Sequence, residues 1–337
     1  MKKQFFVVAG IFLFALCDFC SASTLKPNYF DKVAEQIAKR KAGGFFNFSF
    51  KSSIDGTVQS LLVKIPKNYD PIKKWPMLVV LHGLGDGPIV VPSIDLMVQI
   101  GPYGRGDLRY RGLGEKDVFE AIEIAKKIFT VDDDRIYLTG FSMGADGTFE
   151  LGLKYPDCWA ACVPVCGKLQ NLSLIINGKN LPFWIQAGGK DIVVPASLSK
   201  SVYELACEQG CNDWDYTEHA EMGHNFNVNW NDVEKWMLKQ KKQKKPNSIN
   251  YWGLKPQKVY WLEVLALEKN NTSFTVEALI NDNMIRLNTR NVRSYKIYIK
   301  EAPVSPSSAV VVYENGVKID IQKDKSETVL VRNSELK

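Results

Sequence analysis

Histidine is scarce in this sequence, with only three residues in 337, and long apolar runs are absent after the first residues. No later segment could cross the ~30 Å hydrocarbon core of a membrane. Arginines and aromatic residues are not interleaved as they are in nucleic-acid-binding proteins, and no internal repeat is visible. The sequence therefore predicts a globular protein that binds no nucleic acid and is not stably inserted in a membrane.

Paired cysteines of the kind that bind zinc are also lacking. Two of the seven cysteines lie in the first 22 residues, and the other five are Cys158, Cys162, Cys166, Cys207 and Cys211. Cys207 and Cys211 lie near an expected helix end and could form a disulfide, although an odd count leaves at least one thiol free. The first three are spaced without a C-x-x-C pair, so we interpret them as small buried residues rather than metal ligands. We expect no metal and no cofactor.

The N-terminus has the pattern of an export signal. Lys2 and Lys3 are followed by the apolar run Phe5–Leu16 and by small residues up to Ala22. This pattern predicts a signal peptide over residues 1–22, and hence a secreted or periplasmic protein. A run of twelve residues is too short for an uncleaved membrane anchor.

From residue 45 to residue 242, segments with strand patterns alternate with segments of helical periodicity, after a short helical segment at 23–44. The run Trp75–Leu81 is wholly apolar, which is typical of a central parallel strand covered on both faces. Such alternation predicts an α/β domain over residues 45–245, with a mostly parallel sheet flanked by helices. Strands are expected at 45–50, 61–65, 75–81, 96–100, 136–139, 160–165, 181–186 and 215–218, a turn at 132–135, and helices at 117–129, after 144 to 155, 195–208 and 231–242.

The composition changes at residues 245–248. Before this point, five of the seven residues in Lys239–Lys245 are lysine, which carries part of the net charge of +6 and which we interpret as a solvated helix end and linker. Beyond it, short alternating stretches are separated by turns such as Asn281–Asn283 and Asn315–Gly316. Asn-Gly is a strong hairpin signal. Residues 249–337 are therefore expected to form a small all-β domain.

A candidate nucleophile lies directly after the strand expected at 136–139. Residues 140–144 read Gly-Phe-Ser-Met-Gly and match the Gly-x-Ser-x-Gly elbow, in which a strained strand-to-helix turn exposes the serine oxygen. We therefore predict Ser142 as the nucleophile. The motif alone is weak, but its position between a strand and a helix is the position that the chemistry requires.

A serine nucleophile needs a base and an orienting acid. His224 follows the last expected strand of the first domain, so we predict it as the base, with His219 as a nearby loop residue. Asp191 lies on the loop after the strand at 181–186 and is the predicted acid. Asp213 and Asp215 are weaker candidates because they lie before or within the last strand.

Two backbone amides are needed to bind the oxyanion. We predict that one is the amide of Met143 and that the other is the amide of Gly83 or Leu84, after the strand 75–81. His82 is expected to hold this loop in shape rather than to react. Four loop residues could line the cleft or could simply lie on the surface: Tyr103, Arg105, Asp107 and Tyr110.

Four segments resemble the signature blocks of secreted α/β-hydrolase esterases. They are Leu-His-Gly-Leu-Gly-Asp at 81–86, Gly-Phe-Ser-Met-Gly at 140–144, Gly-Gly-Lys-Asp-Ile-Val-Val-Pro at 188–195 and Met-Gly-His-Asn at 222–225. The nearest types are feruloyl esterases, polyhydroxybutyrate depolymerases and prolyl-oligopeptidase-family hydrolases. The resemblance covers residues 45–242 and implies the α/β-hydrolase fold. The β region is similar to the C-terminal extension of some bacterial members.

Three functions are compatible with these residues. The resemblance favours a serine carboxylesterase, feruloyl- or acetyl-type, that forms an acyl-enzyme on an ester substrate, possibly linked to a polysaccharide. A serine peptidase of the prolyl-oligopeptidase type is the alternative, and a non-catalytic binding protein on a hydrolase scaffold is the third. In the β region, Trp252, Tyr260 and Trp261 could stack on sugars or pack in a core.

Overall fold

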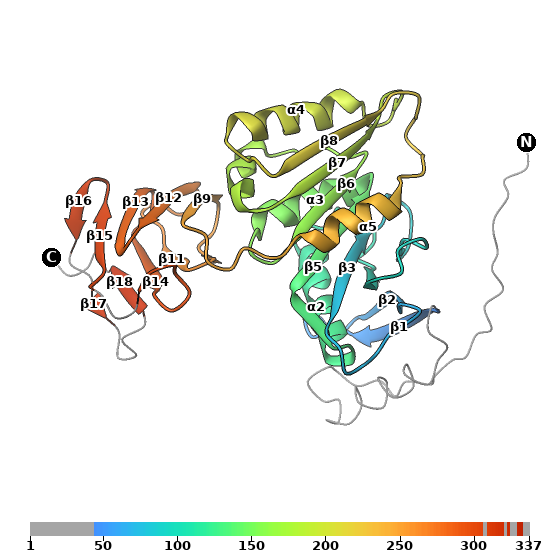
Figure 1. The fold of residues 1–337 in the computed structure, drawn as a ribbon, viewed down its shortest axis with the longest axis horizontal. Coiled ribbons are helices and arrows are strands. Elements are labelled where there is room, and N and C mark those ends of the chain that lie inside the picture. Colours follow the sequence, from blue (N-terminus) through green and yellow to red (C-terminus); the bar gives the residue numbers. More distant parts are fainter. Residues whose placement is uncertain (1–43, 306–308, 320–321, 324–328, 333–337) are drawn as a thin grey trace, which may run out of the picture.

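The computed structural model describes residues 44–305, 309–319, 322–323 and 329–332. The predicted signal peptide and, apart from Gly44, the predicted N-terminal helical segment lie outside these residues. Figure 1 shows the described chain as a larger part that contains a helix-covered sheet and a smaller C-terminal part built of strands.

The larger part is organised around an eight-stranded sheet with the order β1-β2-β4-β3-β5-β6-β7-β8. The strands β3 to β8 pair in parallel, whereas β1 and β2 are antiparallel to their neighbours. The predicted, mostly parallel sheet is therefore confirmed. The strands are β1 (Phe45–Lys51), β2 (Val58–Lys64), β3 (Trp75–Leu81), β4 (Val98–Pro102), β5 (Val131–Phe141), β6 (Ala161–Val165), β7 (Phe183–Gly188) and β8 (Trp214–His219).

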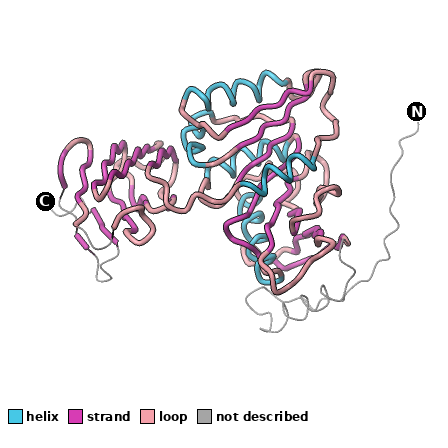
Figure 2. The backbone as a smooth tube through the Cα atoms, in the orientation of Figure 1, coloured by secondary structure: helices cyan, strands magenta, loops and turns pink. Residues whose placement is uncertain are grey.

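Helices cover both faces of this sheet, as Figure 2 shows. Strand β3 explains why, because Met77 and Val79 belong to one apolar core and Leu78 and Val80 to another. The first core includes residues of α2 (Leu113–Ile128), α3 (Met143–Lys154), α4 (Ala196–Glu208) and the 3₁₀ segment η1 (Leu172–Asn180). The second core includes Val233 and Met237 of α5 (Trp230–Lys239).

The turn predicted at residues 132–135 is wrong, because these residues lie within β5. The pairing of β5 with β3 is irregular here: it passes from Trp75↔Val131 to Met77↔Ile136. The extra residues on β5 form a bulge. Bulged residues leave the hydrogen-bonded ladder between strands, which explains their polar composition. Asp132 and Arg135 pair across the bulge at 2.6 Å.

The C-terminal part contains two five-stranded sheets, with the orders β10-β11-β14-β18-β17 and β16-β15-β13-β12-β9. Apolar residues of the two sheets share one core. The hairpin predicted at Asn315–Gly316 is confirmed, and both residues have the positive φ (50° and 82°) that such a tight turn requires. The strands are β9 (Ser248–Gly253), β10 (Lys258–Val259), β11 (Leu262–Ala266), β12 (Phe274–Asn281), β13 (Met284–Arg290), β14 (Ser294–Tyr298), β15 (Val311–Glu314), β16 (Val317–Ile319), β17 (Gln322–Lys323) and β18 (Val329–Arg332).

The three aromatic residues that could stack on sugars, Trp252, Tyr260 and Trp261, pack in or against apolar cores instead. Trp261 and Tyr260 are buried in the C-terminal core, and Trp261 donates its indole N–H to the Pro246 carbonyl at 2.8 Å. Trp252 is half-buried and packs against the first core of the larger part. Stacking on a sugar would therefore need other residues.

The two parts are joined through η1 and the C-terminal end of α3. The Asn177 side chain donates to the Trp252 carbonyl at 3.0 Å and accepts from the Trp252 amide at 2.6 Å. The Lys154 carbonyl, at the last residue of α3, accepts hydrogen bonds from Tyr251 and Gln257. The C-terminal part is thus attached where α3 ends.

The five cysteines of the described residues are free thiols. The disulfide considered between Cys207 and Cys211 is not present: Cys207 is exposed on α4, whereas Cys211 is buried with its sulfur 3.6 Å from the Ile175 carbonyl oxygen. Among the described helices, none combines the length and the apolar character needed to span a membrane.

Candidate active site

The candidate site begins at the turn between β5 and α3. Ser142 occupies this turn with φ 55° and ψ −116°, a strained conformation for a residue with a side chain. Its amide donates to the Val165 carbonyl of β6 at 2.9 Å, which ties the turn to the neighbouring strand. A Cβ on Gly144 would overlap the Leu81 carbonyl oxygen, so only glycine lets α3 begin this close to β3. The elbow predicted from the motif has the backbone geometry that the motif implies.

Ser142, His224 and Asp191 form one hydrogen-bonded chain. The Nε2 atom of His224 lies 3.0 Å from Oγ of Ser142, and its Nδ1 atom lies 2.7 Å from Oδ2 of Asp191. Asp191 follows β7 and His224 follows β8, so three segments distant in sequence meet at the carboxyl ends of parallel strands. Such an arrangement can transfer a proton from the serine hydroxyl to the imidazole while the carboxylate holds the ring.

The Asp191 carboxylate is buried, and both of its oxygens have hydrogen-bond partners. Its Oδ1 atom accepts from the amides of Val193 and Val194, both at 2.8 Å, while Oδ2 faces His224. Burial alone would raise the pKa of Asp191, but the hydrogen bonds from His224 and from the two amides outweigh it, so the pKa is lowered. The group is therefore held ionised, as an orienting carboxylate needs to be.

The loop that carries Asp191 packs directly on the loop that carries His224. A Cβ on Gly188 would overlap the Gly223 carbonyl oxygen, and the Lys190 amide donates to the Met222 carbonyl at 2.8 Å. Glycine at 188 thus lets the acid and the base approach through their backbones. The spacing between the two side chains is set by this backbone contact.

The segment after β3 lies beside the start of α3. Both ring nitrogens of the buried His82 lie 2.8 Å from backbone carbonyl oxygens, those of Gly83 and Tyr103. This geometry supports the predicted shaping role of His82. The Met143 amide is the first N–H of α3 and has no partner within the helix. The carbonyl oxygen of His82 would lie 2.8 Å from a Cβ on Gly144, so the chain just before Gly83 passes beside the start of α3.

The four loop residues considered for the cleft have mainly structural contacts. Tyr110 is fully buried and donates to the His82 carbonyl at 3.0 Å. Arg105 pairs with Asp55 and Asp117. Asp107 accepts from the Gly85 amide at 2.8 Å, and Tyr103 stacks on His82. Of the four, Asp107 and Tyr103 brace the loop that carries Gly83 and Leu84.

The rival histidine and carboxylates lie outside the hydrogen-bonded chain. His219 ends β8, with Nε2 2.9 Å from Oε1 of Gln186 and its ring against Phe226. Asp213 precedes β8, and Asp215 lies within it, one residue after the strand begins. The prediction of His219 as a loop residue is therefore wrong, because it is the last residue of β8 and pairs with Gly188 of β7.

Nothing in the sequence pattern indicates that Cys166 belongs to this site. Burial and the adjacent Asp191 carboxylate raise the pKa of its thiol to about 12, so the S–H group is available to donate to that carboxylate. The ligand atoms of Cys166, Asp191 and His224 lie within 4.8 Å of one another. Because Asp191 and His224 already share a hydrogen bond, we regard Cys166 as a support for Asp191 rather than as part of a metal site.

Exposed apolar side chains on the segments of the site were also missed. Ile192 and Val193, directly after Asp191, are 93% and 64% exposed, Leu84 is 57% exposed and Met222 is 47% exposed. We call these four residues the apolar rim. The sequence places all four on loops, but nothing in the local sequence indicates that their side chains are exposed rather than buried.

The strand order, the antiparallel second strand and the serine elbow after β5 together settle the architecture of the larger part. It has the α/β-hydrolase fold. No protein-family model and no curated protein matches the chain.

Solved structures that resemble this hydrolase fold are esterases and other hydrolases. A thermostable esterase is 24% identical with a TM-score of 0.48, over 58% of this chain and 63% of that protein. An S-formylglutathione hydrolase from Staphylococcus aureus is 15% identical with a TM-score of 0.49, over 59% of this chain and 98% of that one. A ferulic acid esterase from Anaeromyces mucronatus is 16% identical with a TM-score of 0.46, over 57% and 86%. At these identities and TM-scores the likenesses assign no activity, which has to be argued from the residues of the site.

Proposed function

We propose that the protein is a serine hydrolase that cleaves carboxylic esters through an acyl-enzyme. The observation that carries this proposal is the hydrogen-bonded chain from Ser142 through His224 to Asp191. A partly buried serine on a strained turn, an imidazole within 3.0 Å of its oxygen and a buried ionised carboxylate are the parts that acyl transfer needs.

In the first half-reaction, Oγ of Ser142 attacks the ester carbonyl carbon and its proton passes to Nε2 of His224. The Asp191 carboxylate holds Nδ1–H and stabilises the imidazolium. The carbonyl oxygen becomes an oxyanion, bound by the Met143 amide and by the amide of Leu84 or Gly83. When the tetrahedral intermediate collapses, the C–O bond to the alcohol breaks, and Nε2–H of His224 protonates the departing oxygen.

In the second half-reaction, water takes the place of the alcohol. His224 accepts a proton from the water, the hydroxide attacks the acyl carbon and the same two amides bind the new oxyanion. Collapse then breaks the bond to Oγ, which regains its proton from His224. The products are a free alcohol and a carboxylic acid, and the protein returns to its initial state.

The apolar rim supports an ester whose acyl or alcohol group carries apolar surface, such as a feruloyl group. Ile192 and Val193 follow the acid directly, Leu84 is a candidate oxyanion residue and Met222 precedes the base by two residues. Exposed apolar groups gathered at a reactive site are more often used for binding than left to solvent. We therefore place the feruloyl type ahead of the acetyl type.

Labelling with a fluorophosphonate probe tests the nucleophile. The wild-type chain should be labelled once, and Ser142→Ala should not be labelled. If Ser142→Ala is labelled like the wild type, or if neither is labelled, the proposal fails and a binding protein on a hydrolase scaffold becomes the better explanation.

A substrate panel tests the reaction. It should contain aryl acetates, feruloyl esters, hydroxybutyrate oligomers and peptide anilides. We expect ester cleavage, fastest with feruloyl esters and slower in an Ile192→Ser, Val193→Ser variant. The matched control is Ile72→Ser, which removes an 88% exposed isoleucine outside the site. Cleavage of anilides in preference to esters would indicate a peptidase instead.

Export rests on the pattern of residues 1–22 alone, and we propose a secreted or periplasmic location on that basis. N-terminal sequencing of the chain recovered from the periplasm or medium of an expressing bacterium tests it. A mature chain that begins at Ser23 supports the proposal, and a chain retained in the cytoplasm with Met1 intact contradicts it.

A further inference from the structure

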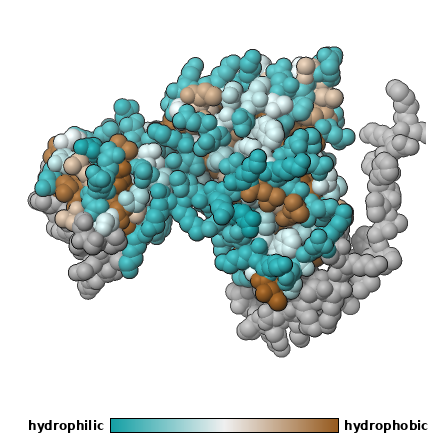
Figure 3. Space-filling view, in the orientation of Figure 1, coloured by the Kyte–Doolittle hydropathy of each residue, from teal (hydrophilic) through white to brown (hydrophobic). Residues whose placement is uncertain are grey.

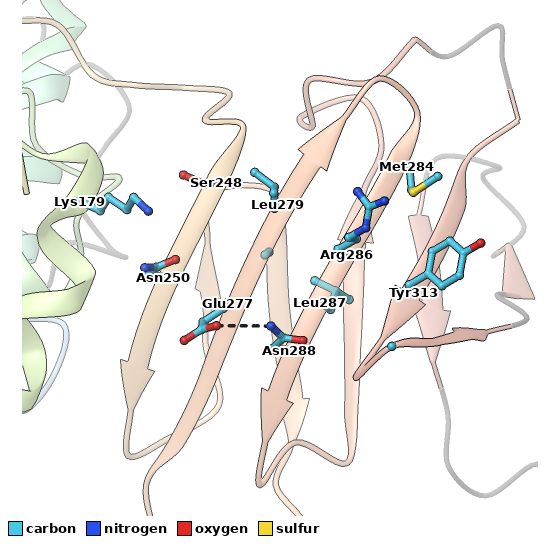
Figure 4. Close-up of a pocket in the computed structure, with 12 residues that line it drawn as sticks. Lys179, Ser248, Asn250, Glu277, Leu279, Met284, Arg286, Leu287, Asn288 and Tyr313 are labelled. Atoms are coloured by element: carbon cyan, nitrogen blue, oxygen red, sulfur yellow. Dashed lines mark hydrogen bonds between the residues drawn. The ribbon is translucent and has the colours of Figure 1, made fainter. Parts of the chain in front are cut away.

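The outer face of one C-terminal sheet forms a hollow of about 770 Å³. Strands β9, β12, β13 and β15 and the turn residue Gly316 supply its floor, and Lys179 of η1 stands at its edge on the side of the larger part, as Figure 4 shows. The strand residues that alternate with this face, such as Ile280 and Ile285, are buried in the core beneath it. Apart from Ala278 and Leu287, which belong to that core, the side chains that line the hollow are therefore not needed for the C-terminal core.

Two rows of side chains cross the strands of this hollow. In the first row, Tyr313 is the register partner of Arg286, Arg286 of Leu279, and Leu279 of Ser248. This row runs over four strands, a span of about 14 Å at ~4.8 Å per strand spacing. It presents an aromatic ring, a guanidinium, an aliphatic side chain and a hydroxyl in sequence.

The second row lies two residues along the strands. Glu277 is the register partner of Asn288 on one side and of Asn250 on the other, and the Asn288 side chain donates to Glu277 at 3.4 Å. An amide, a carboxylate and an amide offer both donors and acceptors to hydroxyl groups. The two rows together offer apolar contact beside hydrogen bonding along one direction.

The cations of the hollow lack counter-charges. Within the described part of the chain, neither Arg286 nor Lys179 makes an ion pair or a side-chain hydrogen bond, although Glu277 lies only one strand away. A guanidinium with free donors at the centre of a row can bind an oxyanion such as a carboxylate through two parallel hydrogen bonds. The two cations of the hollow are therefore available to pair with anionic groups of a ligand.

We infer that this hollow binds a linear polysaccharide that carries carboxylates, that is, a chain containing uronic acid units. The carboxylates pair with Arg286 and Lys179, the hydroxyls bond to the Asn288–Glu277–Asn250 row, and the C–H faces of the sugar rings contact Tyr313 and Leu279. An acidic peptide matches the cations as well, but a sugar chain carries hydroxyl groups on every ring, each able to donate and accept, and so matches a continuous row of amide and carboxylate groups more fully.

The hollow lies away from the reactive serine. Ser142 precedes the first residue of α3, while the C-terminal part is attached at the last turn of that helix, a separation of about 18 Å for twelve residues. Figure 1 shows the C-terminal part on the side of the sheet where α3 ends. Binding in the hollow is therefore a separate activity from ester cleavage and does not depend on it.

Affinity electrophoresis of the full chain tests the inference, with Ser142→Ala as the parent so that esters in the polymer stay intact. Polygalacturonate should retard migration, and the same polymer with its carboxylates methyl-esterified should retard it far less. Arg286→Gln should weaken binding about tenfold or more, the size expected when a hydrogen bond to a charged group is lost. Tyr313→Ala should weaken it as well.

The matched control is Lys235→Gln, which removes one positive charge from an exposed position on α5 and should bind like the parent. Melting temperatures of all variants establish that each is folded. Equal retardation by both polymers, stronger binding of poly-glutamate than of polygalacturonate, or loss of binding in Lys241→Gln, Lys245→Gln but not in Arg286→Gln would each overturn the inference. The last result would assign the anion to the lysine-rich segment 239–245 instead.

Discussion

The ring of Phe141 lies 4.9 Å from the imidazole of His224, with their planes inclined by 49°. Phe141 directly precedes Ser142, so the strand that presents the serine also supports the histidine from one face. Asp191 fixes the same imidazole through Nδ1. These two contacts therefore hold the imidazole in the orientation in which Nε2 faces Oγ of Ser142.

Replacing any member of this chain should therefore remove most of the turnover. We expect Ser142→Ala, His224→Gln and Asp191→Asn each to lower kcat for a reactive ester by about 10⁴, the size seen when a catalytic triad is broken. Steady-state kinetics with an aryl ester measure this. His219→Gln is the control, since His219 contacts Gln186 rather than Ser142. A loss below tenfold in His224→Gln would show that another group accepts the proton.

Acid should remove the contribution of Asp191 to stability. Its pKa is lowered in the folded chain, so its stabilising effect is complete above the ordinary value near 3.9 and is lost as the pH falls through the folded value. We expect the difference in unfolding free energy between wild type and Asp191→Asn to be largest at neutral pH and to shrink in acid. Urea titrations at several pH values measure it, and a difference independent of pH would contradict the argument.

Gly144→Ala should damage both stability and activity. Its new methyl group would meet the Leu81 carbonyl, a backbone atom that cannot rotate away. We expect a loss of about 1–3 kcal/mol in unfolding free energy, together with a lower kcat because the Met143 amide shifts. Gly87→Ala is the matched control, as its methyl group would meet no atom within 4 Å. Similar behaviour of the two variants would refute this account of the elbow.

A thiol count tests the cysteine assignment. Cys207 is exposed, whereas burial raises the pKa of Cys211 to about 12 and holds the pKa of Cys162 well above its usual range. We expect Ellman's reagent to react quickly with one thiol more in the wild type than in Cys207→Ser. An equal count in both, with an extra pair of thiols appearing only after reduction, would indicate that Cys207 and Cys211 form a disulfide after all.

Asn177 should be important for holding the two parts together. Its side chain makes three hydrogen bonds, two with the Trp252 backbone and one with the Leu153 carbonyl. Asn177→Ala leaves buried groups without partners, at about 1–3 kcal/mol each. We expect thermal unfolding to separate into two transitions and limited proteolysis near residue 245 to accelerate. Asn212→Ala, at an exposed position, should do neither.

Sequence patterns predicted the architecture best where both faces of a strand are buried. Trp75–Leu81 matches β3 residue for residue because its apolar run meets a core on each side. Strand β13 alternates buried Ile285 and Leu287 with exposed Arg286 and Asn288, which is the pattern expected of a half-buried strand in the all-β region. The acidic residues of 132–135 resemble a turn, and only the irregular pairing with β3 explains why they belong to a strand.

The site was predictable to the extent that it follows chain order. Serine after the fifth strand, aspartate after the seventh and histidine after the eighth can be deduced from a motif and from the few available histidines. Cys166 could not be found this way, because its role depends on a contact with a loop that begins 22 residues later. The exposure of Ile192 also depends on tertiary structure and not on its neighbours in sequence.

The attachment of the C-terminal part to the end of α3 has a practical consequence for engineering. A cut at residue 245 would strip the cover from η1 and leave Asn177 and the carbonyls of Leu153 and Lys154 facing water. Grafts and tags are better placed on an exposed turn of the C-terminal part that does not line the hollow, for example at Asn270–Asn271 between β11 and β12. A protein modified there would keep the contact between its two parts intact and leave access to Ser142 open.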